Sequence, residues 1–222
     1  MTQLLFVHLA KTGGTSVRRI LKASAANNFD CLHHNTFCRF RHGERVHRGR
    51  LDRSRIGPYS LAFLMVRHPV TRLVSCYRYF QAGGLNAQSK DRFFPADQAA
   101  QKFLMRHAPS LEECCHSLAE IAERIPHFQP MSSWLDGWPN PLADRVLTGR
   151  QEHFDRDLQL LFEQLGEPLN TALLQRSNSS GSLKSASAEI GLSAEALAKL
   201  QAFYAEDFRR FNYRLDPYSS LD

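Results

Sequence analysis

One short segment near the start of the chain combines residue types that bind anions. A lysine, two glycines and three hydroxyl residues follow one another in Lys11-Thr12-Gly13-Gly14-Thr15-Ser16. Glycines let the backbone approach an oxyanion closely, a lysine supplies a full positive charge, and hydroxyls and backbone amides donate hydrogen bonds. The segment therefore predicts a loop that holds an anionic group of a ligand.

A second candidate anion site lies at Arg67, directly after the apolar run 61–66. The forked guanidinium of an arginine suits a phosphate group, and Ser75 follows in the predicted helix beyond it. Two such sites at neighbouring strand ends suit a nucleotide with phosphates at both ends of its ribose.

The first segment differs from the P-loop of nucleoside triphosphatases. In that motif the lysine follows the last glycine, whereas Lys11 precedes both Gly13 and Gly14. Arg67 also stands where the second strand would offer a magnesium-binding aspartate. The sequence therefore predicts that protein cations, and no metal, meet the charge of the ligand, which disfavours a magnesium-dependent kinase.

Two strand–loop–helix units must position these residues. The apolar runs 4–9 and 61–66 are typical of buried parallel strands. Apolar residues then recur at helical spacing from Val17 and from Val70, with Pro69 as a favourable first helical residue. Alternating strands and helices predict an α/β fold with a mostly parallel central sheet flanked by helices, whose ligands bind at the carboxyl ends of the strands.

The rest of the chain gives further expectations. Residues 39–55 hold seven arginines, show no clear period, and predict a loop or a short helix. In chain order, we also expect an irregular stretch over 83–110, a helix over 111–125, a strand over 144–147, a helix over 158–165 ended by Gly166, a serine-rich loop over 176–188, and a last helix capped by Ser193 and running to Phe211.

Length and composition predict a single globular domain over residues 1–222. Hydrophobic residues make up 43% and charged residues 23% of the chain, which excludes wholesale disorder. No apolar run reaches the roughly 20 residues of a membrane span. The N-terminus lacks the pattern of a leader, and the five cysteines fit no disulfide framework. We therefore expect a cytoplasmic protein with reduced thiols.

Positive charge is concentrated in the first quarter of the chain. The net charge is +6, yet residues 1–60 alone hold 11 lysines and arginines against 3 acidic residues. Such a region suggests an anionic ligand, for example a nucleotide, a nucleic acid, an acidic glycan or a lipid head group.

Two segments resemble those that bind 3′-phosphoadenosine 5′-phosphosulfate (PAPS) in sulfotransferases. Residues 8–16 resemble the 5′-phosphosulfate loop of that family, and residues 66–77 resemble its 3′-phosphate element. The resemblance is closest to the carbohydrate branch that includes the heparan sulfate and uronyl 2-O-sulfotransferases. It implies a P-loop-like three-layer fold and the metal-free transfer of a sulfuryl group from PAPS to a hydroxyl acceptor, a glycan or a glycolipid.

The resemblance also implies roles for individual residues. Lys11 would stabilise the charge on the leaving phosphate, Arg67 and Ser75 would bind the 3′-phosphate, and the serine-rich loop would close over the nucleotide. The implied donor-binding residues are Lys11, Thr12, Gly13, Gly14, Thr15, Ser16, Arg67, Ser75, Arg176 and Lys184. Two positions depart from the family pattern, since His68 replaces an aspartate and Met131 replaces a glutamine.

Transfer to a hydroxyl needs a base, and histidine titrates in the required range. His47 lies 20 residues before Arg67, the position at which related carbohydrate sulfotransferases carry a histidine. His42 is the second candidate, and His33 and His34 follow. His127, in a weaker similarity over 127–130, is expected on the acceptor side.

Two other classes of function are alternatives. A nucleic-acid-binding module would use the arginines of 39–55, although only Phe37 and Phe40 stand near them, whereas single-strand binders interleave aromatic and basic residues. An atypical nucleotide kinase would use the first segment and would depend on magnesium. We expect no nucleic acid as partner, and the arginines of 39–55 could instead hold an acidic acceptor.

Overall fold

The structure, a computed structural model, describes residues 3–24, 26–33, 36–50, 59–83, 95–136, 145–175 and 191–214. The chain divides into two compact units. Unit 1 comprises Met1–Arg67 with Leu135–Ser182, and unit 2 comprises His68–Trp134 with Leu183–Asp222. The division does not test whether the two units form a single domain, so the single domain expected over 1–222 stays a prediction.

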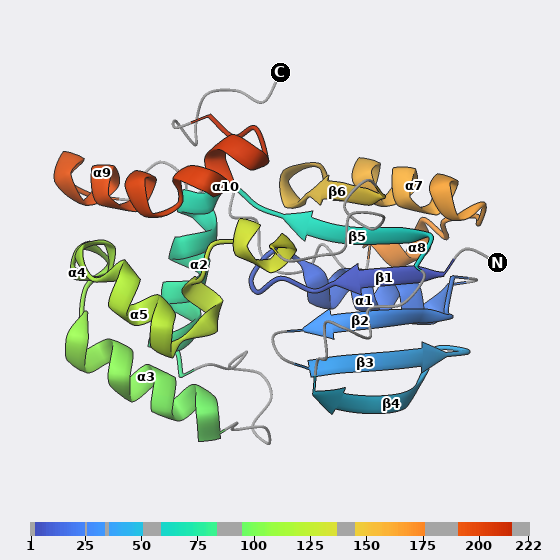
Figure 1. The fold of residues 1–222 in the computed structure, drawn as a ribbon, viewed down its shortest axis with the longest axis horizontal. Helices are drawn as coiled ribbons and strands as arrows, with labels where there is room; N and C mark the ends of the chain where they lie inside the picture. The colour runs from blue at the N-terminus through green and yellow to red at the C-terminus, as the bar shows by residue number, and fades with distance from the viewer. Residues whose placement is uncertain are drawn as a thin grey trace. The chain divides into compact units, whose positions relative to one another are not determined.

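Unit 1 is built on a six-stranded sheet with the strand order β4-β3-β2-β1-β5-β6 (Figure 1). Its strands are β1 (Leu4–Val7), β2 (Phe29–His33), β3 (Thr36–Arg41), β4 (Glu44–Arg50), β5 (Leu61–Val66) and β6 (Val146–Arg150). The pairs β1–β2, β1–β5 and β5–β6 are parallel, whereas β2–β3 and β3–β4 are antiparallel. The predicted α/β fold with a mostly parallel central sheet is therefore confirmed.

The helices of unit 1 cover one face of this sheet. They are α1 (Gly14–Ala23), α7 (Phe154–Leu165) and α8 (Ala172–Gln175), with the short helix η4 (Gln151–His153) before α7. Leu4 and Phe6 alternate toward this face from β1 and are buried with Val17 and Ile20 of α1. The predicted end of α7 is confirmed, because Gly166 follows it with the left-handed φ of 70° that glycine adopts easily.

The arginine-rich segment after β2 differs from its expectation. Residues 39–50 form most of the β3–β4 hairpin rather than a loop or short helix, and 51–55 lie outside the described residues. Asp30 of β2 is fully buried and accepts hydrogen bonds from Arg39 at 3.1 Å, Arg41 at 3.2 Å and the Tyr59 hydroxyl at 2.6 Å. On the other face, the ring of Phe40 packs toward α1. Cross-strand pairing with residues distant in sequence therefore fixes this segment as strands.

In the described residues of unit 2, all regular secondary structure is helical. It contains α2 (Pro69–Gln81), α3 (Pro95–His107), α4 (Leu111–His116), α5 (Leu118–Arg124), η2 (Pro126–Phe128), most of η3 (Ser132–Leu135), α9 (Ala194–Phe203) and α10 (Ala205–Arg210). None of the helices in the described ranges is long and apolar enough to cross a bilayer.

Three expectations for unit 2 were wrong: one missed a helix, and two missed an interruption within a helix. The stretch 83–110 was expected to be irregular, but it contains α3. The helix expected over 111–125 is interrupted at Ser117, and the last helix is interrupted at Tyr204. The start of the last helix is confirmed, because the Ser193 side chain accepts a hydrogen bond from the Ala196 amide.

Candidate functional site

The loop after β1 turns sharply into the N-terminus of α1. Lys11 and Gly13 have positive φ angles of 63° and 87°, and the buried Thr12 hydroxyl donates to the Leu9 carbonyl at 3.1 Å. The amides of Ser16 and Val17 both donate to the Gly13 carbonyl, which leaves the earlier amides of α1 at the helix end. The first turn of α1 has no acidic residue, so its partial positive charge suits an anion.

The two glycines of the loop are required for different reasons. A Cβ at Gly14 would lie 2.0 Å from Cδ2 of His8, so the imidazole occupies the space of any side chain at that position. A Cβ at Gly13 would make an ordinary contact, 3.4 Å from the Phe154 ring, but the left-handed φ of 87° would strain the backbone of any other residue there. The loop therefore packs against the His8 ring at Gly14 and against the Phe154 ring at Gly13.

Arg67 lies at the carboxyl end of β5, next to this loop. Its side chain is buried, and its guanidinium donates to the Lys11 carbonyl at 3.4 Å. This contact follows from the parallel pairing of β1 with β5, which brings the two strand ends to one edge of the sheet. The expectation that the two candidate anion sites occupy neighbouring strand ends is confirmed for Lys11 and Arg67.

Ser75 and His68 belong to unit 2, so the structure leaves the pairing of Ser75 with Arg67 as a prediction. Ser75 is half-buried on α2. His68 caps α2, because its Nδ1 accepts from the Val70 amide at 3.3 Å. Its Nε2 therefore carries the proton and donates to the Arg214 carbonyl at 2.9 Å. The imidazole thus caps α2 at a position where the family pattern has an aspartate.

Among the candidate histidines that the structure describes, His33 is the one that lies near the loop. His33 ends β2, and its ring centroid lies 4.4 Å from that of His8, the residue that underlies Gly14. His8 was not singled out from the sequence. The contact between the two rings could not be foreseen without knowing that β1 and β2 are neighbours.

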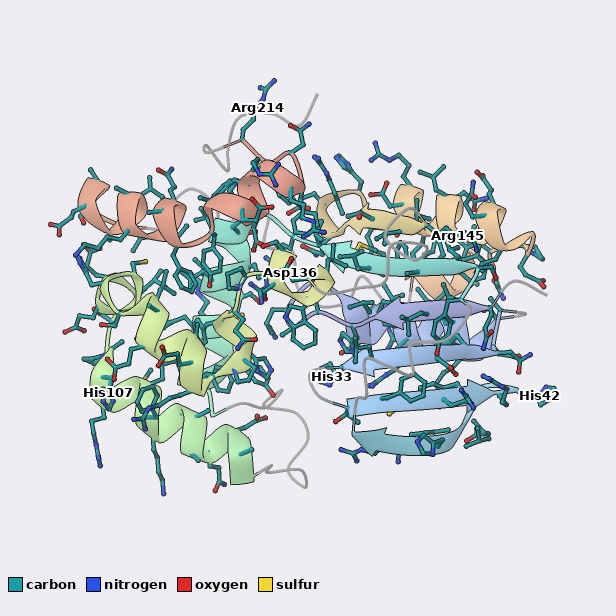
Figure 2. All side chains as sticks on the ribbon, in the orientation of Figure 1. His33, His42, His107, Asp136, Arg145 and Arg214 are labelled. Atoms are coloured by element: carbon teal, nitrogen blue, oxygen red, sulfur yellow. The ribbon has the colours of Figure 1, made fainter. Side chains whose placement is uncertain are left out.

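The two histidines preferred from the sequence lie elsewhere in unit 1. His42 is exposed in the β3–β4 turn, and Figure 2 shows it at the opposite end of the sheet from His33. His47 is exposed in the middle of β4, level with Leu5 of β1 and three strands away from it, which is about 14 Å at ordinary strand spacing. The register therefore places neither His42 nor His47 beside Lys11.

The segment around His127 is held by its backbone within unit 2. Arg72, 1% exposed, donates to the His127 carbonyl at 2.7 Å. The Tyr204 hydroxyl donates to the Phe128 carbonyl at 2.7 Å. Met131, which departs from the family pattern, is fully buried. These contacts show how the segment packs, whereas the expected acceptor-side role of His127 stays a prediction.

Arg176, Lys184 and His34 lie outside the described residues. All five cysteines are free, and burial raises the pKa of the Cys31 thiol to about 12, so Cys31 stays protonated near neutral pH. Within the described ranges, no cluster of three histidine, cysteine or acidic side chains could hold a metal ion.

Comparison with known proteins gives one match. The model of the family described as "Sulfotransferase family" matches residues 2–214. Searches of curated proteins and of solved structures found no significant match.

Proposed function

The chain belongs to the sulfotransferase family, and from this premise we propose that it transfers a sulfuryl group from PAPS to a hydroxyl of a carbohydrate. The acceptor oxygen attacks sulfur while the bond from sulfur to the bridging oxygen of the 5′-phosphate breaks. The electron pair of that bond leaves with 3′-phosphoadenosine 5′-phosphate (PAP), and a histidine takes the hydroxyl proton. No metal is needed in this scheme.

The observation that carries the proposal is the contact between Arg67 and the Lys11 carbonyl. It supports a single ligand held at both neighbouring strand ends. In this proposal the amides and hydroxyls of 12–16 hold the 5′-phosphosulfate, and Lys11 stabilises the charge that grows on the leaving phosphate. Arg67 and Ser75 hold the 3′-phosphate.

The base is best assigned to His33 among the described histidines. It ends the strand next to β1 and packs on His8, within the same edge of the sheet as Lys11. The sequence favoured His47 from its spacing to Arg67, with His42 as the second candidate, but the register of β3 and β4 argues against both. His33→Ala should lower turnover and leave PAP affinity near that of the wild type, whereas His47→Ala should change neither.

Ligand binding in a metal chelator tests the donor. With PAP at about 100 times its dissociation constant, the folded protein gains about 2.7 kcal/mol, which corresponds to a rise in melting temperature of roughly 5–10 °C for a chain of this size. ATP should give a smaller rise. Transfer of labelled sulfate from PAPS to a glycan mixture should persist in the chelator. A rise given only by ATP with magnesium would instead indicate a nucleotide kinase.

A further inference from the structure

Two cysteines of unit 1 lie directly opposite each other on neighbouring strands. Cys31 of β2 pairs with Cys38 of β3 in the antiparallel register, and Figure 1 shows the two strands side by side. Opposed residues of an antiparallel pair have Cα atoms about 4.5–5.5 Å apart, and disulfides join residues whose Cα atoms are about 4.4–6.8 Å apart. The backbone of this pair therefore has the spacing that a disulfide requires.

Both thiols lie on the face of the sheet that α1 covers. Cys31 belongs to the core cluster of unit 1, and Cys38 packs against that cluster. Two residues further along the strands, the opposed residues Phe29 and Phe40 stack with ring centroids 4.7 Å apart. Because side chains two residues apart on a strand share a face, the two thiols are neighbours in the same way as the two rings.

The two thiols differ in exposure, which sets the order in which they can react. Cys31 is 2% exposed, whereas Cys38 is half-buried. Burial raises the pKa of the Cys31 thiol to about 12, so its thiolate, the reactive form, is scarce near neutral pH. A reagent from solvent therefore meets Cys38 first, and Cys31 reacts second, from within the fold.

Cationic side chains lie beside this pair. Arg48 of β4 is paired with Cys38 and is exposed. Burial has the largest effect on the pKa of the Cys31 thiol, but Arg18 of α1 is near enough to lower that pKa. A positive potential attracts anions, and glutathione disulfide carries more carboxylates than amines. The surroundings of the pair therefore suit a small anionic disulfide.

We propose that Cys31 and Cys38 are a redox-sensitive modification site, which a small anionic disulfide oxidises to an intrachain disulfide. The Cys38 thiolate attacks one sulfur of the small disulfide, whose S–S bond breaks, so that a mixed disulfide forms and one small thiolate leaves. Cys31 then loses its proton to water and attacks the Cys38 sulfur, and the second small thiolate leaves. Two protein thiols are thereby oxidised, one small disulfide is reduced, and the two protons end on the small thiols. The proposal is independent of the proposed function.

The cysteines of unit 2 provide an internal comparison. Cys76, Cys114 and Cys115 are at most 2% exposed. The Cys76 thiol donates to the His127 carbonyl at 3.3 Å, and burial raises the pKa of the Cys115 thiol to about 12. Since all three thiols are buried, a small disulfide should react with them only when unit 2 unfolds.

Peptide mapping of the wild type tests the site. The folded protein is incubated with glutathione disulfide, unfolded in an alkylating reagent and digested with trypsin. Cleavage after Lys22 and Arg39 places Cys31 and Cys38 in one peptide, 23–39. We expect this peptide to lose two hydrogen atoms and to escape alkylation, whereas the cysteine peptides of unit 2 are alkylated. Dithiothreitol added before the alkylation should restore both thiols.

Two cysteine variants separate the two steps. In Cys38→Ser the first thiol is absent, and oxidation of Cys31 should slow at least about tenfold because its thiolate is scarce. In Cys31→Ala the second thiol is absent, and Cys38 should stop at the mixed disulfide, heavier by one glutathionyl group. In the wild type, conversion of the mixed disulfide should become about tenfold faster per pH unit below the pKa of about 12, as the thiolate fraction of Cys31 rises.

A charge variant tests the approach of the small disulfide. Arg48→Gln should slow the first step about threefold, as expected for one charge roughly 6 Å away in water. The control Arg106→Gln removes the same charge from an exposed position of α3 and should react like the wild type. Equal rates in the two variants would remove Arg48 from the site.

Three results would overturn the proposal. A wild-type peptide 23–39 that is fully alkylated after the incubation would mean that no disulfide forms. A mixed disulfide on Cys38 that persists in the wild type as long as in Cys31→Ala would mean that the two thiols do not meet. Oxidation of the unit 2 cysteines to the same extent as Cys31 would mean that unfolding, and not the pairing of β2 with β3, exposes the thiols.

Discussion

The loop after β1 and the β3–β4 hairpin both carry positive charge next to α1, but they use it for different purposes. In the hairpin, Arg39 and Arg41 are paired with the fully buried Asp30, so their charge contributes to the fold. In the loop, Lys11 adjoins the N-terminus of α1, and Arg67 contacts its carbonyl. The positive charge of unit 1 therefore includes cations that are paired with a buried acid and cations that lie around the N-terminus of a helix, and only the second kind supports a proposed anion site.

Lys11→Ala is expected to have the largest effect, on rate rather than on stability. A cation that stabilises the leaving group only in the transition state contributes about 10²–10³ in rate. The melting temperature without ligand should stay close to that of the wild type, because Lys11 is not part of the core. Initial rates of labelled-sulfate transfer measure the loss. Lys199→Ala, on the exposed face of α9, is the matched control, and equal rates in all three proteins would contradict the role of Lys11.

Asp30→Asn should show the opposite pattern. Removing one partner of a buried ion pair costs up to about 3–5 kcal/mol, and we expect about 3 kcal/mol because the Arg39 side chain is 44% exposed and can be solvated. Urea denaturation measures this loss. PAP affinity at low temperature should be unchanged. Asp155→Asn, at an exposed position of α7, should cost less than 1 kcal/mol, and an Asp30 variant as stable as that control would show that the hairpin does not depend on the pair.

The two regions also differ in how far the sequence predicts them. The loop depends on neighbours in sequence: two glycines, a preceding apolar strand and a following helix stripe are all visible locally, so its position and the adjoining helix were predicted. The hairpin depends on Asp30 and Phe29, which lie on another strand, and its exposed residues break the alternation expected of strands. The same reason applies to the proposed base, because only the order of the strands reveals that His33 lies beside His8 and that His47 does not.

Gly14→Ala should destabilise the loop by about 2 kcal/mol, as expected for overpacking. The added methyl group would lie 2.0 Å from the His8 ring. His8→Ala/Gly14→Ala should recover much of this loss, because the methyl group then occupies the space of the imidazole. Urea denaturation of the single and double variants gives the coupling energy directly. Additive losses would mean that His8 does not determine the need for glycine.

The smallest effect concerns pH and the strand between the two regions. Burial raises the pKa of Cys31 in β2 to about 12, above the value of about 8.5 in an unfolded chain. The unfolded state therefore loses this proton first as pH rises, and the contribution of Cys31 to stability is complete below about pH 8.5 and declines above it. Between pH 8.5 and 9.5 we expect the free energy of unfolding to fall by about 1 kcal/mol because of this thiol.

Two variants test this expectation. In Cys31→Ala the fall in the free energy of unfolding should be smaller by that amount, whereas in Lys11→Ala it should be unchanged. The alkaline sensitivity would then belong to the β2 side of the sheet and not to the loop. Identical slopes of stability against pH in wild type and Cys31→Ala would show that the thiol is not protected by the fold.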